Sequence, residues 1–142
     1  MSGSNYPLNM KQIAADLFTA KALVDEANKR TPKEAKYIKG QAGYHLQQAS
    51  EKMIKIQIYY SGKQLDMRKM YKHPLNDLIL YAKSIGVQLD VPKYIDQNQL
   101  VITSWEAEGR YDVHMTVKIT QLEKCLEEIN VWYDRLKSNG YK

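Results

Sequence analysis

The feature that most constrains this fold is a strong helix start followed by an unusually long apolar stripe. In Thr31-Pro32-Lys33-Glu34 the threonine suits the N-cap, the proline suits the first helical position, and the glutamate can accept a hydrogen bond from the N–H of the cap. Apolar residues then recur every three or four positions until Ser61-Gly62, where the glycine can end the helix: Ala35, Ile38, Ala42, His45 or Leu46, Ala49, Met53, Ile56 and Tyr60. The pattern predicts a helix over 32–61, which at ~1.5 Å per residue spans roughly 45 Å. A small core does not need that length, so part of the stripe is expected to face a partner chain.

The same periodicity predicts four further helices. They are a first helix over 8–28, a short one over 74–85, a stretch over 92–108 that Gly109 breaks or bends, and a last helix from Thr116, its expected cap, to Asn139. Glycine and proline fall between these stretches, and no alternating pattern is long enough to indicate a strand. Five helices with short connections, four of them forming the core, predict an all-α helical bundle.

Length and composition fit one domain, which we predict over 8–140, preceded by a flexible tail over 1–7. Hydrophobic residues make up 44% of the 142 residues, enough for a real core. Cys125 is the only cysteine, so neither an internal disulfide nor a cysteine-rich zinc site can form. No long apolar run and no secretory signal is recognisable, so we expect a cytoplasmic protein without a membrane segment.

Positive charge is concentrated in one part of the chain. The formal net charge is +5, yet residues 29–72 alone contain eleven basic and three acidic side chains. Such a run is typical of a solvated helix face, and it is also typical of a surface that binds RNA or a nucleotide. Both interpretations remain open at this point.

Three sequence blocks resemble the HEPN family. Tyr44–Lys52 reads Tyr-His-Leu-Gln-Gln-Ala-Ser-Glu-Lys, similar to the family's Tyr-His-x-Gln-Gln-x-x-Glu-Lys helix, and the apolar tail 53–56 follows it. His73–Leu78 resembles the family's His-Asp-Leu helix start, and Gly109–Asp112 resembles its Arg-Tyr segment before the last helix. The blocks occur in the family's order, so the resemblance covers roughly 8–137.

The resemblance implies an up-and-down four-helix bundle with an additional short helix and a long second helix, usually a homodimer. In bacteria such proteins are often encoded beside a minimal nucleotidyltransferase, as a toxin–antitoxin or nucleotide-handling pair. Many relatives are metal-independent ribonucleases that use an arginine and, four to six residues later, a histidine. Here the candidate catalytic pair is Arg110 and His114, with three residues between them. A histidine can take the 2′-hydroxyl proton and an arginine can stabilise the developing charge; alternatively, Arg110 only pairs with Asp112 or Glu108.

A polar stretch of the long helix supplies the candidate ligand contacts. Five residues are predicted to bind a ligand: His45, Gln48, Lys52, His73 and Tyr111. The first three lie on or near one helix face, because they are three and four residues apart. The alternative is an internal network in which Gln48 and Lys52 pair with Glu51, or with Arg110 and Tyr111. Both interpretations stay open.

We therefore expect a HEPN-like protein that acts with a nucleotidyltransferase partner and binds RNA or a nucleotide. If it is an enzyme, we expect a metal-independent endoribonuclease. The chain has no glycine-rich phosphate loop and no His-Glu-x-x-His zinc helix, so we expect no cofactor and no metal. The alternative is a non-catalytic helical interaction module, which would expose an apolar patch and would not bind polyanions.

Overall fold

The fold is all-helical in the part of the chain that the computed structural model describes, residues 7–111 and 117–142, the side chains of 108–111 excepted. These residues form seven helices and no strand, which confirms the predicted all-α class. The helices are α1 (Met10–Ala27), α2 (Pro32–Tyr59), α3 (Met67–Met70), α4 (Leu75–Ser84), α5 (Lys93–Gln97), α6 (Gln99–Tyr111) and α7 (Ile119–Ser138). The tail predicted over 1–7 lies, apart from Pro7, outside the described residues.

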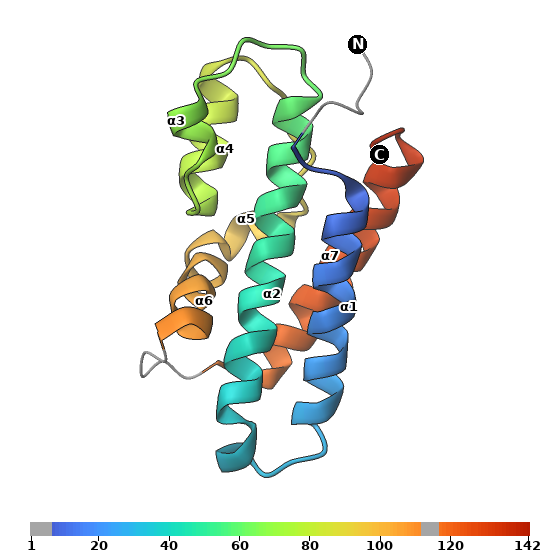
Figure 1. Cartoon of the computed structure of the whole chain (residues 1–142), viewed down its shortest axis with the longest axis vertical. Helices are drawn as coiled ribbons and strands as arrows, with labels where there is room; N and C mark the ends of the chain where they lie inside the picture. The colour runs from blue at the N-terminus through green and yellow to red at the C-terminus, as the bar shows by residue number, and fades with distance from the viewer. Residues whose placement is uncertain (1–6, 112–116) are drawn as a thin grey trace.

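Helix α2 is the axis of the molecule. Its start is the predicted capping box, in which Thr31 and Glu34 exchange hydrogen bonds, and its end at Tyr59 falls two residues before the predicted one. Figure 1 shows α1 and α2 running antiparallel side by side, with α7 crossing behind them and α3, α4 and α6 on the other side of α2. Contacts between elements join α2 to α1, α4, α6 and α7. Every other long element therefore packs on this one helix.

The core lies where these helices meet, and fully buried side chains such as Ile13, Met53 and Trp132 fill it. Gly43 lets α6 approach α2 closely, because a Cβ at this position would lie 3.0 Å from Cγ of the Trp105 side chain. The two ends of the described chain also meet, since the Met10 N–H donates to the Lys142 carbonyl at 3.0 Å. No helix of the described residues combines the length and apolar character needed to cross a membrane.

Three local predictions were wrong. The stretch predicted as one helix over 92–108 is two helices, and the break falls at Asn98 while α6 continues through Gly109. Asn98 ends α5 because its side-chain amide donates to the Tyr94 carbonyl at 2.8 Å, and its own carbonyl accepts from Ile102 in the first turn of α6. The break is thus made by the short polar side chain of Asn98, whereas Gly109, which was expected to break or bend the helix, lies within α6.

The other two errors lie before α4 and α7. Residues 62–72 lie between the helices predicted over 32–61 and 74–85, where no helix was expected, and they contain α3, which Asp66 caps through its side chain and which Met70 anchors with 1% of its surface exposed. The last helix begins at Ile119 after Lys118, which makes no side-chain cap bond, instead of at the expected Thr116 cap, which lies outside the described residues. Val117 is already buried before that helix begins.

Candidate functional site

The half-buried side of α2 carries two polar clusters, each built on a carboxylate. We call the half-buried positions of α2 from Tyr44 onward the outer face of α2: Tyr44, His45, Gln48, Lys52, Lys55 and Tyr59. The Asp16 cluster consists of Asp16, His45 and Lys52, and the Glu51 cluster consists of Gln47, Glu51, Lys55 and His73. Carboxylates are rarely buried unless they are paired, so Asp16 and Glu51 each require the side chains that contact them.

In the Asp16 cluster a carboxylate from α1 holds two side chains of α2. Asp16 Oδ1 lies 3.0 Å from Nδ1 of His45, and Asp16 Oδ2 accepts a hydrogen bond from Nζ of Lys52 at 2.6 Å. His45 and Lys52 are two helical turns apart and therefore face the same neighbour. The Asp16 side chain is 11% exposed and its two partners are about a quarter exposed, so the outer atoms of both partners reach solvent.

In the Glu51 cluster a carboxylate of α2 holds the segment that follows α3. Glu51 Oε1 lies 2.8 Å from Nδ1 of His73, and Glu51 Oε2 lies 3.4 Å from Nζ of Lys55. The amide of Gln47 donates to the His73 carbonyl at 3.2 Å and to Glu51 at 3.4 Å, and it accepts from Gln48 at 2.8 Å. The Glu51 side chain is 5% exposed, whereas that of His73 is 49% exposed.

The carboxylates determine which histidine nitrogen is presented to a ligand. An ionised carboxylate only accepts hydrogen bonds, so Nδ1 of His45 and Nδ1 of His73 donate in this geometry. In the neutral ring Nε2 is then an acceptor, in the right state to take a proton or a hydrogen bond. With the amines of Lys52 and Lys55, the outer face of α2 offers donors and acceptors in fixed positions, as recognition of a polar anionic ligand requires.

Four of the five residues predicted to contact a ligand belong to the two clusters or are hydrogen-bonded to them. His45 and Lys52 meet on Asp16, and Gln48 and His73 are joined through Gln47 and Glu51. The alternative that paired Lys52 with Glu51 was wrong, because adjacent residues of a helix point about 100° apart and Lys52 turns toward α1.

The sequence interpretation missed Asp16. A signal was present, since this acidic residue lies within the apolar stripe formed by Ile13, Leu17 and Ala20, where a charge needs a partner.

The predicted catalytic pair and the fifth ligand contact lie where the side chains are not described. Arg110 and Tyr111 belong to the last turn of α6, and only their backbone is described, while His114 lies outside the described residues. The pairing of Arg110 with His114, and its alternatives with Glu108 or Asp112, therefore stay predictions.

The described residues offer neither a metal site nor a reactive thiol. Among the described residues no three His, Cys, Asp or Glu side chains are grouped so that they could hold a metal ion. Cys125 is buried, and burial, with a smaller contribution from the charge of Glu128, raises the pKa of its thiol far above the usual range. This thiol stays protonated and is not a nucleophile at neutral pH.

An aromatic and basic segment adjoins the Glu51 cluster. Tyr71 is 71% exposed and stands next to Lys72 and His73 in the chain. Burial, with a smaller contribution from Tyr71, raises the pKa of Tyr59 at the end of the outer face. The segment that His73 anchors therefore brings an exposed ring close to the outer face of α2.

Comparison with known proteins adds no relative to this picture. No family model, no curated protein and no solved structure matches the chain. The function is therefore inferred from the chemistry of the two clusters and of the basic segment beside them.

Proposed function

We propose that this chain is a HEPN-type protein that binds RNA or a nucleotide along the outer face of α2 and acts together with a minimal nucleotidyltransferase. One observation carries the proposal. The stretch Tyr44–Lys52, on which the resemblance rests, contributes to both polar clusters, in which Asp16 and Glu51 hold two histidines and two lysines. Groups fixed in this way lose little entropy when they bind a ligand.

The chemistry of this face suits a nucleic acid or nucleotide. Each lysine amine has three donors and gives one to its carboxylate, which leaves donors for phosphate oxygens. The exposed Tyr37 and the half-buried Tyr44 precede Gln48 on the same side of α2 at helical spacing, and tyrosine rings can stack on unpaired bases. The basic run over 29–72 supplies long-range attraction.

The proposal includes an up-and-down four-helix bundle that forms a homodimer. The 28 residues of α2, about 42 Å at ~1.5 Å per residue, leave surface for a second copy at the exposed start of the helix, whereas Ala42, Ala49 and Met53 of the apolar stripe are buried within the chain. Light scattering of the purified chain measures its mass directly. A monomer at every concentration tested would remove the dimer and leave the binding proposal intact.

Binding is tested with fluorescently labelled single-stranded RNA and with nucleoside phosphates. We expect Lys52→Met to weaken binding about tenfold, as loss of a charge-assisted hydrogen bond predicts. The matched control is Lys124→Met, which removes an equally charged, ion-paired lysine from α7, away from the outer face. No binding by the native chain, or equal losses in both variants, would contradict the proposal.

Ribonuclease activity is the part of the proposal assigned to Arg110 and His114. Native chain and His114→Ala are incubated with RNA in EDTA, which removes metal-dependent contaminants. Cleavage that only the native chain performs supports a metal-independent endoribonuclease. Equal or absent cleavage removes the activity while leaving RNA binding to be judged by the binding assay.

A second function, the non-catalytic interaction module, is favoured by one surface. Leu80, Leu100 and Val101 are exposed hydrophobic residues of α4 and α6, and Leu100 is 73% exposed. Exposed apolar groups of this kind are typical of protein contacts. This function predicts that Leu100→Ser abolishes binding of a partner protein that the native chain captures, and that the native chain binds no polyanion.

A further inference from the structure

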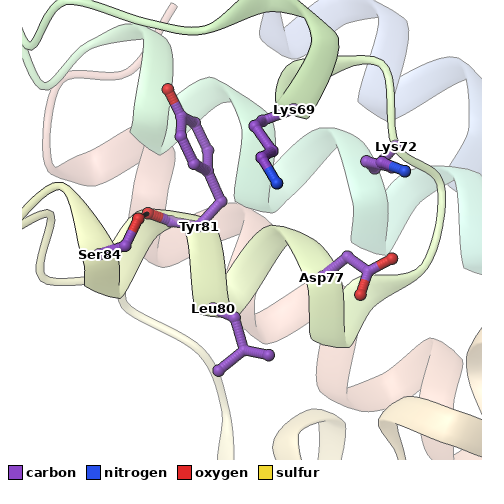
Figure 2. A pocket seen from close by; sticks show the side chains of 6 residues that line it. All are labelled: Lys69, Lys72, Asp77, Leu80, Tyr81 and Ser84. Atoms are coloured by element: carbon purple, nitrogen blue, oxygen red, sulfur yellow. Dashed lines mark hydrogen bonds between the residues drawn. The ribbon is translucent and has the colours of Figure 1, made fainter.

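An open surface pocket of about 340 Å³, which we call the cavity, lies between the α3 segment and α4, outside the two clusters, and all of its lining residues except the half-buried Tyr81 are exposed. Its lining residues are Lys69, Lys72, Asp77, Leu80, Tyr81 and Ser84. Figure 2 shows the Lys69 amine directed from α3 toward α4, beside the ring of Tyr81, and Lys72 on the segment that follows, on the same side as Asp77. The volume is at the lower end of the range for small-ligand pockets.

The walls of this cavity are held in place although α3 has only four residues. At the start of α3 the Asp66 N–H donates to the Tyr81 hydroxyl at 2.7 Å, which fastens the segment to α4. At its end the Glu51 cluster holds the ring and the carbonyl of His73, next to Lys72. Met70, almost fully buried, fixes the middle. The two lysines are therefore presented on a segment anchored at three points.

Lys69 and Lys72 differ from Lys52, Lys55 and Arg68 in their partners. Lys52, Lys55 and Arg68 each make an ion pair with a carboxylate. Neither Lys69 nor Lys72 has a carboxylate within 4.0 Å among the described residues. Hydrogen bonds from Arg68, together with the charges of Arg68 and Lys69, lower the pKa of Asp66, whose carboxylate is thus already engaged. The cavity is thus lined by two exposed ammonium groups that no carboxylate of the described residues contacts.

Asp77 narrows the class of ligand. A carboxylate in the same cavity repels a simple anion but accepts hydrogen bonds from hydroxyl or amino groups. The cavity therefore suits a molecule with an anionic end, hydrogen-bond donors and an apolar face to lie against the Tyr81 ring. A nucleotide unit has all three.

We propose that this cavity binds one ribonucleotide unit, with its phosphate between Lys69 and Lys72 and its ribose hydroxyls donating to Asp77. The inference deepens the proposed function and rests on it, since it names where a nucleotide or one unit of an RNA strand is bound. The 2′-hydroxyl is the group that distinguishes RNA from DNA, so Asp77 gives the cavity its preference for ribose.

The test is a calorimetric titration of the full chain with adenosine 5′-monophosphate, its 2′-deoxy counterpart, inorganic phosphate and a short single-stranded oligoribonucleotide. We expect Lys69→Met and Lys72→Met each to weaken binding of the monophosphate about tenfold. The matched control, Lys83→Met, removes an exposed lysine of α4 that lies outside this cavity, and it should change binding less than about twofold. Circular dichroism checks that each variant is folded.

Asp77→Asn separates the ribose contact from a general charge effect. We expect it to remove the preference for the ribonucleotide over the deoxyribonucleotide without weakening inorganic phosphate. If Asp77 only repelled anions, the variant would tighten all ligands equally, and the assignment of ribose would be overturned.

The arms of this titration distinguish the two proposals. RNA binding that responds to Lys52→Met and not to the cavity variants overturns the cavity and leaves the proposed function. Absence of any binding overturns both. Binding of the monophosphate but not of the oligonucleotide supports the cavity as a site for a free nucleotide, whereas lysine-dependent binding of both supports an RNA strand.

Discussion

The Asp16 and Glu51 clusters use the same groups but join different parts of the molecule. In the first, a carboxylate of α1 holds two residues of α2. These polar contacts, which we call the seam, link two long helices that already pack together. In the second, a carboxylate of α2 holds the chain after α3, a helix of four residues that contains Lys69 and is followed by Lys72. The same chemistry thus supports the fold on one side of α2 and positions a basic segment on the other.

The clusters also differ in whether water can hydrogen-bond to the side chains that remain once the central carboxylate has been removed. The outer atoms of His45 and Lys52 reach solvent, so both can be hydrated once Asp16 is removed. In the other cluster Gln47 has no exposed surface, and its amide loses an acceptor once Glu51 is removed. A buried polar group left without a partner costs more than one that can turn to water.

The largest expected effect is therefore that of Glu51→Ala. We expect it to lower the free energy of unfolding by about 2–4 kcal/mol, since it leaves Gln47 and Lys55 without their buried acceptor. Urea unfolding followed by circular dichroism measures it. Glu127→Ala is the control, because that side chain is 71% exposed on α7. A loss no larger than that of the control would show that the burial argument is wrong.

Asp16→Ala should cost less, about 1–2 kcal/mol, because both of its partners become hydrated and only the seam between α1 and α2 is lost. The same urea experiment gives the value. A larger loss than that of Glu51→Ala would reverse the ranking and make the Asp16 cluster the more tightly buried of the two.

Sequence patterns predicted the long elements well. The Thr31 capping box and the regular stripe fix α2 almost to its ends, since caps and periodicity are local properties. They failed at α3 and at Asn98, where a single capping side chain decides the outcome. Short elements carry too little periodicity to be distinguished from a loop.

For the contacts between helices in the candidate site, the sequence predicted the residue on α2 but not the residue that it meets. His45, Gln48 and Lys52 follow from their spacing on one helix, but their partner on α1 is 29 and 36 residues away from His45 and Lys52 in the chain. Which neighbour a polar side chain meets depends on how the helices pack, and that is a tertiary property. The cavity beside α4 likewise depends on contacts between segments distant in sequence.

A smaller expected effect, on the rate of trypsin cleavage, would show whether the Glu51 cluster positions the basic segment. Glu51→Gln keeps the shape of the side chain and removes the charge that holds His73, so the segment over 66–73 should open more often. Limited trypsin digestion should then cut after Arg68, Lys69 or Lys72 several-fold faster, since cleavage follows the population of the open form. Asp16→Asn is the matched variant and should leave this rate unchanged; an equal increase there would show that only overall stability had changed.

The smallest expected effect is the coupling between the two clusters. Asp16→Asn, Glu51→Gln and the double variant form a thermodynamic cycle, and we expect the single losses to add within about 0.5 kcal/mol, because the clusters share no hydrogen-bond partner. Gln48 lies between them, one turn from Lys52 on α2 and bonded to Gln47. A coupling above about 1 kcal/mol would mean that the outer face acts as one network, and Gln48→Ala should then abolish it. Additivity would instead show that the seam between α1 and α2 and the anchor of the basic segment can change independently, so that the anchor can be altered without loosening that seam.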